Sequence, residues 1–343
     1  MTDMTEHNRR GFGGATGDTG TGDTGTGALG TGARRALIAI AVAVLCILPF
    51  VASNFLMFQL TMLLSVSIAV MGLNVIVGYG GQTSLGHGAI YAIGAYSTAI
   101  LMESFGVNWL IAVLLAAAIS FVFGLLFGWP ALRLKGHHLA LATFALALAM
   151  PQVLKNDAIA EWTGGVQGVL VFGPSAPAWT GLSHSAFLYL VVLVFFLLAL
   201  IMLQGLYSSR MGRAVIAVKE NQIAAASMGV HVTGTKLFNF AISCMLTGLA
   251  GALFTLITEF VTPDSFSIML SIFFLVAVVV GGAGTLLGPI IGALFIQFVP
   301  NVAENISTSA TSAIYAALLL GVVFFFPRGA VGLAQSLTRR FGR

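Results

Sequence analysis

The chain has 343 residues, of which 58% are hydrophobic and only 8% are charged. An ordinary soluble domain carries about 25% charged residues, and no water-soluble fold of this length could bury so much apolar side chain. The composition therefore excludes a soluble enzyme or binding module and indicates a polytopic membrane protein. The formal net charge of +4 is typical of Lys and Arg in cytoplasmic loops, so it does not indicate nucleic-acid binding.

The two ends of the chain differ from its apolar centre. Residues 1–35 form a Gly/Thr-rich repeat with almost no apolar side chains, which predicts a disordered cytoplasmic tail. The apolar run that follows is interpreted as a retained signal anchor, because a second apolar run comes directly after it. Residues 331–343 are predicted to be a basic cytoplasmic tail.

Apolar runs separated by short polar breaks fill the region between the tails. Several are shorter than the ~20 residues that a straight membrane span needs. The two runs on either side of residues 280–285 form two spans, one broken span or a re-entrant pair. The sequence therefore predicts an all-α membrane helix bundle of about ten spans, or of eight or nine. The predicted spans are 36–52, 55–77, 85–102, 107–128, 138–154, 186–204, 237–259, 268–281, 286–300 and 312–326.

The positive charges predict the orientation of these spans. With both termini in the cytoplasm, 14 of the 15 Lys and Arg residues lie inside and only Lys155 lies outside, as the positive-inside rule requires. This arrangement gives one long outer loop, 155–185, and one long cytoplasmic loop, 205–236.

The cytoplasmic loop carries the most charge in the body of the protein. Its centre, residues 212–228, predicts one or two short amphipathic helices in which Val215, Ile216 and Val218 group with Ile223. Gly229 is expected to end this segment.

The sequence lacks the residues of a self-sufficient enzyme or pump. The spans carry no convincing buried charge, which argues against a proton- or ion-coupled carrier. The pattern G-x-x-x-x-G-K-[ST] is absent, and no His, Cys, Asp or Glu cluster has metal-ligand spacing. We therefore expect no catalytic residue, no metal site and no cofactor bound by this chain.

Glycine is abundant, with 41 residues, and many of them recur at helix-packing spacing. Small residues let helix backbones approach closely in lipid, so tight packing is the simpler interpretation. Gly- and Pro-broken helices also line substrate pathways in transporters. The candidate packing or hinge residues are Gly124, Gly128, Gly281, Gly282, Gly284, Gly288, Pro289 and Gly292.

A polar insertion follows the second predicted span. Its hydroxyls and amides could line a route for a polar or zwitterionic solute, or they could form an ordinary loop at the cytoplasmic boundary. The candidate pathway residues are Asn74, Tyr79, Gln82, Thr83 and Ser84.

Several runs together resemble the LivH/LivM family, the permease subunits of branched-chain amino-acid ABC importers, and its M-type subunit in particular. The longest are GLNVIVGYGGQTSLGHG (72–88), GRAVIAVKE (212–220) and GGAGTLLGP (281–289). The resemblance covers about residues 60–330 in collinear order. Shorter matching runs are 130–136, 163–168, 224–229, 236–240, 248–252, 263–266 and 327–329.

This resemblance implies a permease subunit in the cytoplasmic (inner) membrane of a prokaryote. It would pair with a homologous H-type permease, two cytoplasmic ABC ATPases that use ATP and Mg, and an extracytoplasmic solute-binding protein. Residues 36–330 would form the permease domain. Within it, loop 205–236 would pass ATPase closure to the spans by rigid-body rocking.

The resemblance also implies specific coupling residues in that loop. A short helix would seat in a cleft of the ATPase, and Arg213 and Lys219 would pair with acids on that partner. The implied coupling residues are Arg213, Lys219, Glu220, Ala224, Ala225 and Gly229.

The implied solutes are branched-chain or similar hydrophobic amino acids. Similar permeases serve urea and short amides, so the same architecture with such a solute is one alternative. A stand-alone secondary carrier or channel is an alternative from a different class. His87 and Gly88 stand where the family usually has small apolar residues, so no pathway role is assigned to His87.

Overall fold

A computed structural model describes residues 45, 53–133, 137–176, 183–306, 321 and 329. Within these ranges the chain is almost entirely helical, and its two strands, β1 (Val169–Leu170) and β2 (Phe260–Val261), form a short antiparallel ribbon. The predicted all-α class is therefore confirmed. The predicted spans 36–52 and 312–326 and both predicted tails lie outside the described residues.

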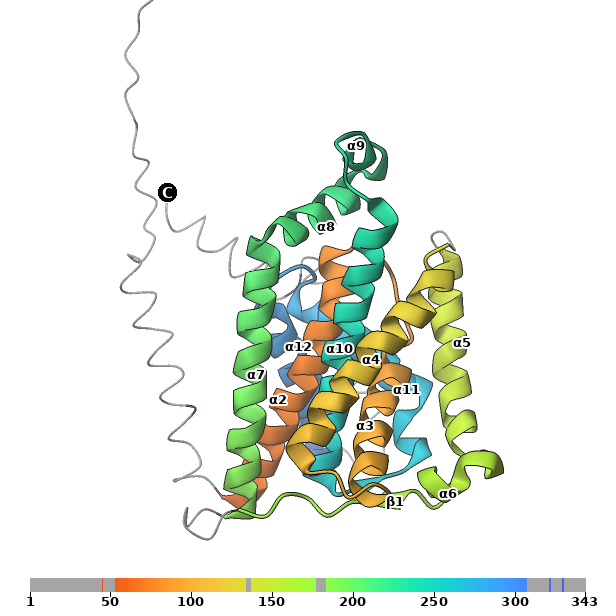
Figure 1. Ribbon diagram of the computed structural model, residues 1–343. Coiled ribbons are helices and arrows are strands. Elements are labelled where there is room, and N and C mark those ends of the chain that lie inside the picture. The colour runs from red at the N-terminus through yellow and green to blue at the C-terminus, as the bar shows by residue number, and fades with distance from the viewer. Residues whose placement is uncertain are drawn as a thin grey trace, which may run out of the picture.

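Eight long helices in the described ranges coincide with the eight remaining predicted spans (Figure 1). They are α2 (Asn54–Asn74), α3 (His87–Glu103), α4 (Trp109–Ala131), α5 (His137–Leu154), α7 (His184–Ser208), α10 (Val232–Thr258), α11 (Ile268–Gly281) and α12 (Gly288–Ile306). The short elements are the π-turn η2 (Val75–Tyr79), η3 (Asp157–Ile159), α6 (Ala160–Thr163), α8 (Arg210–Glu220), α9 (Gln222–Ser227) and η5 (Pro263–Phe266).

Four helical segments of the described chain are long and apolar enough to cross a membrane: Asn54–Tyr79, Trp109–Ala131, His184–Ser208 and Val232–Thr258. A fifth is added if α5 and the helical segment bent from it by 65° form one span. The shorter apolar helices α11 and α12 pack against each other across the 282–287 turn. The structure thus has two helices joined by a turn here, and two spans, one broken span and a re-entrant pair all stay predictions.

Helix starts follow the local sequence. Ser53, Asn108 and Ser183 stand at the N-caps of α2, α4 and α7, and each side-chain oxygen accepts a hydrogen bond from a backbone N–H two or three residues later. Such residues are favoured at this position because the first helical N–H groups have no intrahelical partner.

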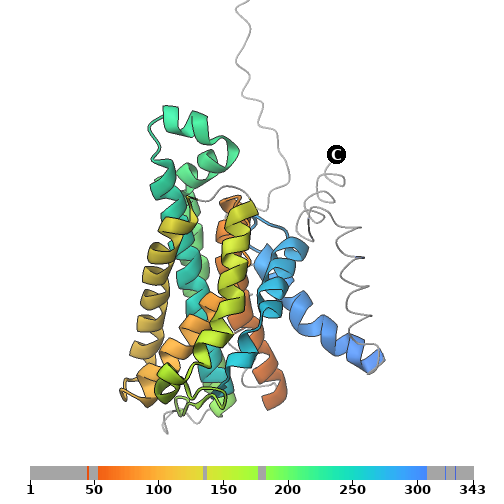
Figure 2. The same ribbon diagram turned by 90° about the vertical axis from the view of Figure 1, so that its right-hand side faces the viewer.

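Helix α10 forms the centre of the bundle and packs against α2, α3 and α4. The most apolar stretch of α10 is 83% buried, whereas that of α4 is only 33% buried. Helix α4 leaves side chains such as Leu114 and Leu126 exposed, as expected where the surroundings are lipid rather than water. Figure 2 shows α12 leaning outward from the rest of the bundle.

The two ends of the bundle differ in charge. Five of the six described Lys and Arg residues lie at the end that carries α8 and α9, and we refer to this end as cytoplasmic on the basis of the positive-inside rule. At the opposite end, α6 and the β1–β2 ribbon cover the helix ends (Figure 1). There Lys155 Nζ lies 2.5 Å from Asp264 Oδ1.

Candidate functional site

Helices α8 and α9 project from the cytoplasmic end of the bundle (Figure 1). Ser209 caps α8 by accepting a hydrogen bond from the Gly212 N–H, at 3.4 Å. A Cβ atom on Gly212 would lie 2.5 Å from the Tyr207 Cα, so this glycine allows α8 to fold back directly from α7. Where the sequence predicts one or two short helices, the structure has two.

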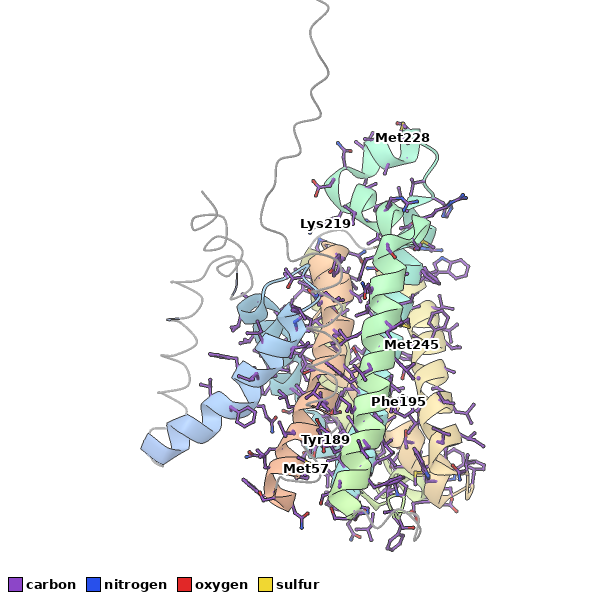
Figure 3. The ribbon with its side chains drawn as sticks, turned by 90° about the vertical axis from the view of Figure 1, so that its left-hand side faces the viewer. Met57, Tyr189, Phe195, Lys219, Met228 and Met245 are labelled. Atoms are coloured by element: carbon purple, nitrogen blue, oxygen red, sulfur yellow. The ribbon has the colours of Figure 1, made fainter. Side chains whose placement is uncertain are left out.

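The apolar residues of this segment are divided between the bundle and the surroundings. Val215 and Val218 are buried, but Ile216 is 41% exposed and Ile223 is 82% exposed. The predicted grouping of all four is wrong, because Ile216 of α8 and Ile223 of α9 lie outside the buried side of the segment. Met228 at the tip is 85% exposed (Figure 3).

Helix α9 is bounded by two residues suited to their positions. The Asn221 Oδ1 atom accepts hydrogen bonds from the Ile223 and Ala224 N–H groups, both at 3.0 Å. Gly229 follows the helix with φ +84° and open space around it, a backbone conformation that glycine adopts without strain. Ala225 is buried, whereas Ala224 and Glu220 are exposed.

Lys219 and Arg213 have hydrogen-bond acceptors within the chain itself. The Lys219 Nζ atom donates to the Gly78 carbonyl oxygen at 2.7 Å, and the Arg213 Nη1 atom donates to the Ser208 carbonyl oxygen at 3.1 Å. Gly78 belongs to η2, so Lys219 joins α8 to the end of α2 (Figure 3). The sequence suggested partner acids for both residues and gave no sign of these backbone acceptors.

The five candidate pathway residues do not line one surface. Asn74 is buried, donates through Nδ2 to the Thr285 carbonyl oxygen and accepts through Oδ1 from the Gly284 N–H, both at 2.8 Å. Tyr79 stacks on Tyr207 with ring centroids 3.6 Å apart. These contacts join the end of α2 to the α11–α12 turn and to α7.

Ser84 belongs to a buried polar chain centred on His87 at the start of α3. Ser243 Oγ donates to the Gly72 carbonyl oxygen at 2.5 Å, so it accepts at 2.7 Å from His87 Nε2. His87 Nδ1 then accepts from Ser84 Oγ at 3.1 Å. Every polar atom of this neutral imidazole is satisfied, and the network assigns its tautomer. The sequence missed it because Ser243 lies 156 positions away.

The candidate packing glycines lie at close helix contacts. Gly124 and Gly128 of α4 face Cys244 and Phe240 of α10, and a Cβ atom on Gly281 would overlap the Gly288 carbonyl oxygen. Gly292 meets Ala277 in the same way, while Gly282 and Gly284 have positive φ in the α11–α12 turn. Pro289 is the second residue of α12, where a missing N–H costs no helical hydrogen bond.

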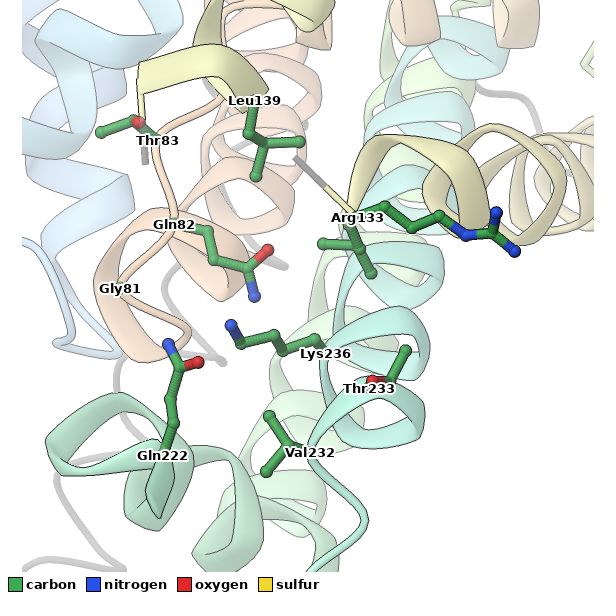
Figure 4. Close-up of a pocket in the computed structure, with 10 residues that line it drawn as sticks. Gly81, Gln82, Thr83, Arg133, Leu139, Gln222, Val232, Thr233 and Lys236 are labelled. Atoms are coloured by element: carbon green, nitrogen blue, oxygen red, sulfur yellow. The ribbon is translucent and has the colours of Figure 1, made fainter. Parts of the chain in front are cut away.

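A cleft of about 440 Å³ opens beside the start of α9. It lies between the loop after η2, the end of α4, and the starts of α5, α9 and α10 (Figure 4). Gln82 and Thr83, two of the candidate pathway residues, line it. The other lining residues are Gly81, Leu132, Arg133, Leu139, Gln222, Val232, Thr233 and Lys236.

Electrostatically the cleft is basic. Its described lining contains Lys236 and Arg133 but no Asp or Glu. The Arg133 guanidinium lies 5.9 Å from the Trp129 ring centroid and points away from the other lining side chains (Figure 4). Lys236 is therefore the cation directed into the space. The described residues contain no group of three His, Cys, Asp or Glu side chains placed to hold a metal ion.

An all-helical bundle with an apolar outer surface and one positively charged end defines a multi-pass membrane protein. Residues 55–326 match the family described as "Branched-chain amino acid transport system / permease component", and the chain belongs to this family. The resemblance found in the sequence is thereby confirmed. No solved structure shows significant similarity to the chain.

Individual relatives are permease proteins. The chain is 36% identical over 284 residues to the high-affinity branched-chain amino acid transport system permease protein LivM of Salmonella typhimurium, covering 76% of this chain. It is 25% identical over 288 residues to LivH of that organism, covering 76% of this chain and 89% of LivH. It is 32% identical over 190 residues to the autoinducer 2 import system permease protein LsrC of Klebsiella pneumoniae, covering 52% of each. The match spans 65% of the length of the LivM relatives.

Proposed function

We propose that the chain is a transmembrane permease subunit of an ATP-binding-cassette importer in the cytoplasmic membrane of a prokaryote. It would move branched-chain or similar hydrophobic amino acids into the cytoplasm by alternating access. A homologous H-type permease, two cytoplasmic ATPases and an extracytoplasmic solute-binding protein would complete the importer. ATP and Mg would be used by the ATPases, with no cofactor held by this chain. Family membership and similarity to both LivM and LivH support this proposal.

The observation that carries the proposal is the uncovered tip of α9. Ile223 and Met228 are the two most exposed large apolar side chains of the α8–α9 segment, at 82% and 85%. Clustered apolar residues on a projecting element favour a protein-binding surface, because their burial against a partner removes them from water. An ATPase is the partner that an importer requires at this end.

The internal contacts of α8 support its role as a coupling element. Helix α8 follows α7 directly, and Lys219 holds it to Gly78 at the end of α2. Asn74, one helical turn earlier, holds the α11–α12 turn through Gly284 and Thr285. A displacement of α8 would therefore move α2, α7 and the α11–α12 pair together, as rigid-body rocking requires.

A second candidate is the same architecture carrying another small polar solute, such as urea or a short amide. Its support is the similarity to LsrC, whose name gives autoinducer 2 as the imported molecule. Related permease sequences are thus associated with more than one kind of solute. The solute bound by the co-purifying binding protein separates this candidate from the first.

Affinity purification from solubilised native membrane, followed by mass spectrometry, tests the proposal. We expect an ATPase pair, a second permease and a binding protein to co-purify. The double variant Ile223→Ser, Met228→Ser should lose the ATPases and keep the second permease. Phe172→Ser, a matched change of an exposed side chain at the opposite end, should lose neither. A chain that purifies alone and transports after reconstitution would instead be a stand-alone carrier or channel.

A further inference from the structure

Three polar side chains with unused hydrogen-bonding capacity converge on the cytoplasmic cleft. Figure 4 shows Lys236 from α10, Gln82 from the loop after η2 and Gln222 from α9 directed into one space. The Gln82 Oε1 atom is buried and has no hydrogen-bond partner among the described residues. Across the same described part of the chain, no hydrogen bond or ion pair of Lys236 Nζ is present. Unpaired buried polar atoms are rare in folded proteins, and they frequently mark the place of a ligand or water.

These groups are complementary to a zwitterion rather than to a simple anion. The Lys236 ammonium is suited to a carboxylate, and among the described residues no acid lines the cleft to compete for it. The unpaired Gln82 Oε1 atom is an acceptor that suits an ammonium group, while the Nε2 of the same amide is a donor that suits a carboxylate. A ligand with a carboxylate and an ammonium on neighbouring atoms would satisfy both.

Part of the remaining wall of the cleft is aliphatic. It consists of Leu132 just after α4, Leu139 of α5 and Val232 of α10, which line the space beside the polar groups. The volume of about 440 Å³ falls within the roughly 300–1,000 Å³ that is usual for small-molecule sites. A ligand with an aliphatic side chain next to charged groups would match this combination of an apolar wall and a positively charged one.

We propose that this cleft is a cytoplasmic binding site for a free aliphatic α-amino acid. Its carboxylate pairs with Lys236, its ammonium donates to Gln82 Oε1, and its side chain contacts Leu132, Leu139 and Val232. The class of ligand rests on the proposed function, because the occupant is the imported solute itself after release. The site thus provides for regulation by the product.

The position of the cleft explains how an occupant would regulate transport. Gln222 lies on α9, whose tip is the proposed ATPase contact, and Gln82 lies on the loop that follows α2. An amino acid held between them bridges the coupling helices and the bundle. Lys219 ties α8, and not α9, to the bundle, so an occupant adds a second link that holds α9 in one position. Occupancy by accumulated product therefore slows the transport cycle.

Binding to the purified complex in nanodiscs, without the solute-binding protein, tests the site. Labelled L-leucine is the probe, and Lys236→Met is expected to raise its Kd about tenfold or more, as for loss of a charge-assisted hydrogen bond. Lys155→Met, a lysine at the outer end, should leave the Kd unchanged, and Lys236→Arg should restore binding. An equal melting temperature for all variants excludes misfolding as the cause.

Competitors identify the ligand chemistry. Leucinamide lacks the carboxylate and 4-methylpentanoate lacks the ammonium, so each should displace leucine much less well than leucine itself. Equal displacement by 4-methylpentanoate or inorganic phosphate would reduce the cleft to a general anion site and overturn the proposal. Leucine binding that is insensitive to Lys236→Met would also overturn it.

Uptake separates this inference from the function on which it rests. If the full importer takes up leucine with ATP but leucine binding is unchanged in Lys236→Met, only the assignment of the cleft is overturned. Absence of leucine uptake overturns the proposed solute class. In inside-out vesicles, leucine on the cytoplasmic side should lower the ATPase rate of the wild-type complex and not that of Lys236→Met. Equal inhibition of both would overturn the regulatory role.

Discussion

The substitution Gly94→Ala offers a sharp test of how the bundle is held together. Gly94 of α3 and Gly248 of α10 meet backbone to backbone. A Cβ atom on Gly94 would overlap the Gly248 carbonyl oxygen and lie 2.6 Å from the Gly248 Cα, whereas ordinary contact begins at 3.4 Å. The two helices would have to separate by at least about 0.8 Å to accept one methyl group.

The cost of this separation can be estimated from overpacking. An added methyl group in a packed core costs about 1–3 kcal/mol. We expect about 3 kcal/mol for Gly94→Ala, because both obstructing atoms are backbone and no side chain can rotate away. Close packing is also what holds helices together in lipid. The melting temperature should therefore fall by more than about 5 °C. It is measured on the detergent-solubilised protein by size-exclusion chromatography after heating.

Gly205→Ala is the matched control. Gly205 lies in α7 with nothing within 4 Å of an added Cβ atom, so the change should be neutral or stabilising by up to about 1 kcal/mol through helix propensity. Equal melting temperatures for the Gly94 and Gly205 variants would refute the argument that backbone contact between α3 and α10 stabilises the bundle.

Four further substitutions test the contacts at the cytoplasmic end. Gly229→Val should abolish ATP-coupled uptake while membrane insertion persists, because φ +84° excludes a β-branched residue. The same loss is expected for Glu220→Ala. Wild-type uptake by either variant would refute the proposed coupling role of that residue. Lys219→Met removes the bond to Gly78 and should lower uptake several-fold more than ATP hydrolysis, so an equal fall in both would contradict it. His87→Ala removes the acceptor of the buried Ser84 hydroxyl and should cost about 1–3 kcal/mol, which an unchanged melting temperature would disprove.

The sequence predicted the helices well because hydropathy is a local property. The ranges 55–77 and 107–128, for example, correspond to α2 with η2 and to α4, since a span needs only a continuous apolar run between polar breaks. Gly229, which the sequence predicts to end the 212–228 segment, follows α9 with a positive φ. Composition and spacing therefore sufficed for the class and the order of elements.

The contacts that join elements were not predictable in this way. Lys219 meets Gly78, which lies 141 positions earlier, and Asn74 meets Thr285, which lies 211 positions later. The spacing of apolar residues identifies the apolar face of a single helix, but it does not show which other element packs against that face. For the same reason it grouped Ile223 with the buried side of α8, because the sequence does not show where the bundle ends.

The hydroxyl of Thr143 has a consequence for how the bundle can open. This side chain of α5 accepts a hydrogen bond from the Leu85 N–H, at 3.0 Å, in the extended stretch before α3. If α5 moved aside, that amide would lose its acceptor, and an unpaired amide in hydrocarbon costs several kcal/mol. Water can replace the threonine oxygen, but an acyl chain cannot. Separation of α5 from this stretch therefore requires water to enter between them. The contact between α5 and the stretch before α3 can open towards water, but it stays closed where lipid tails surround it.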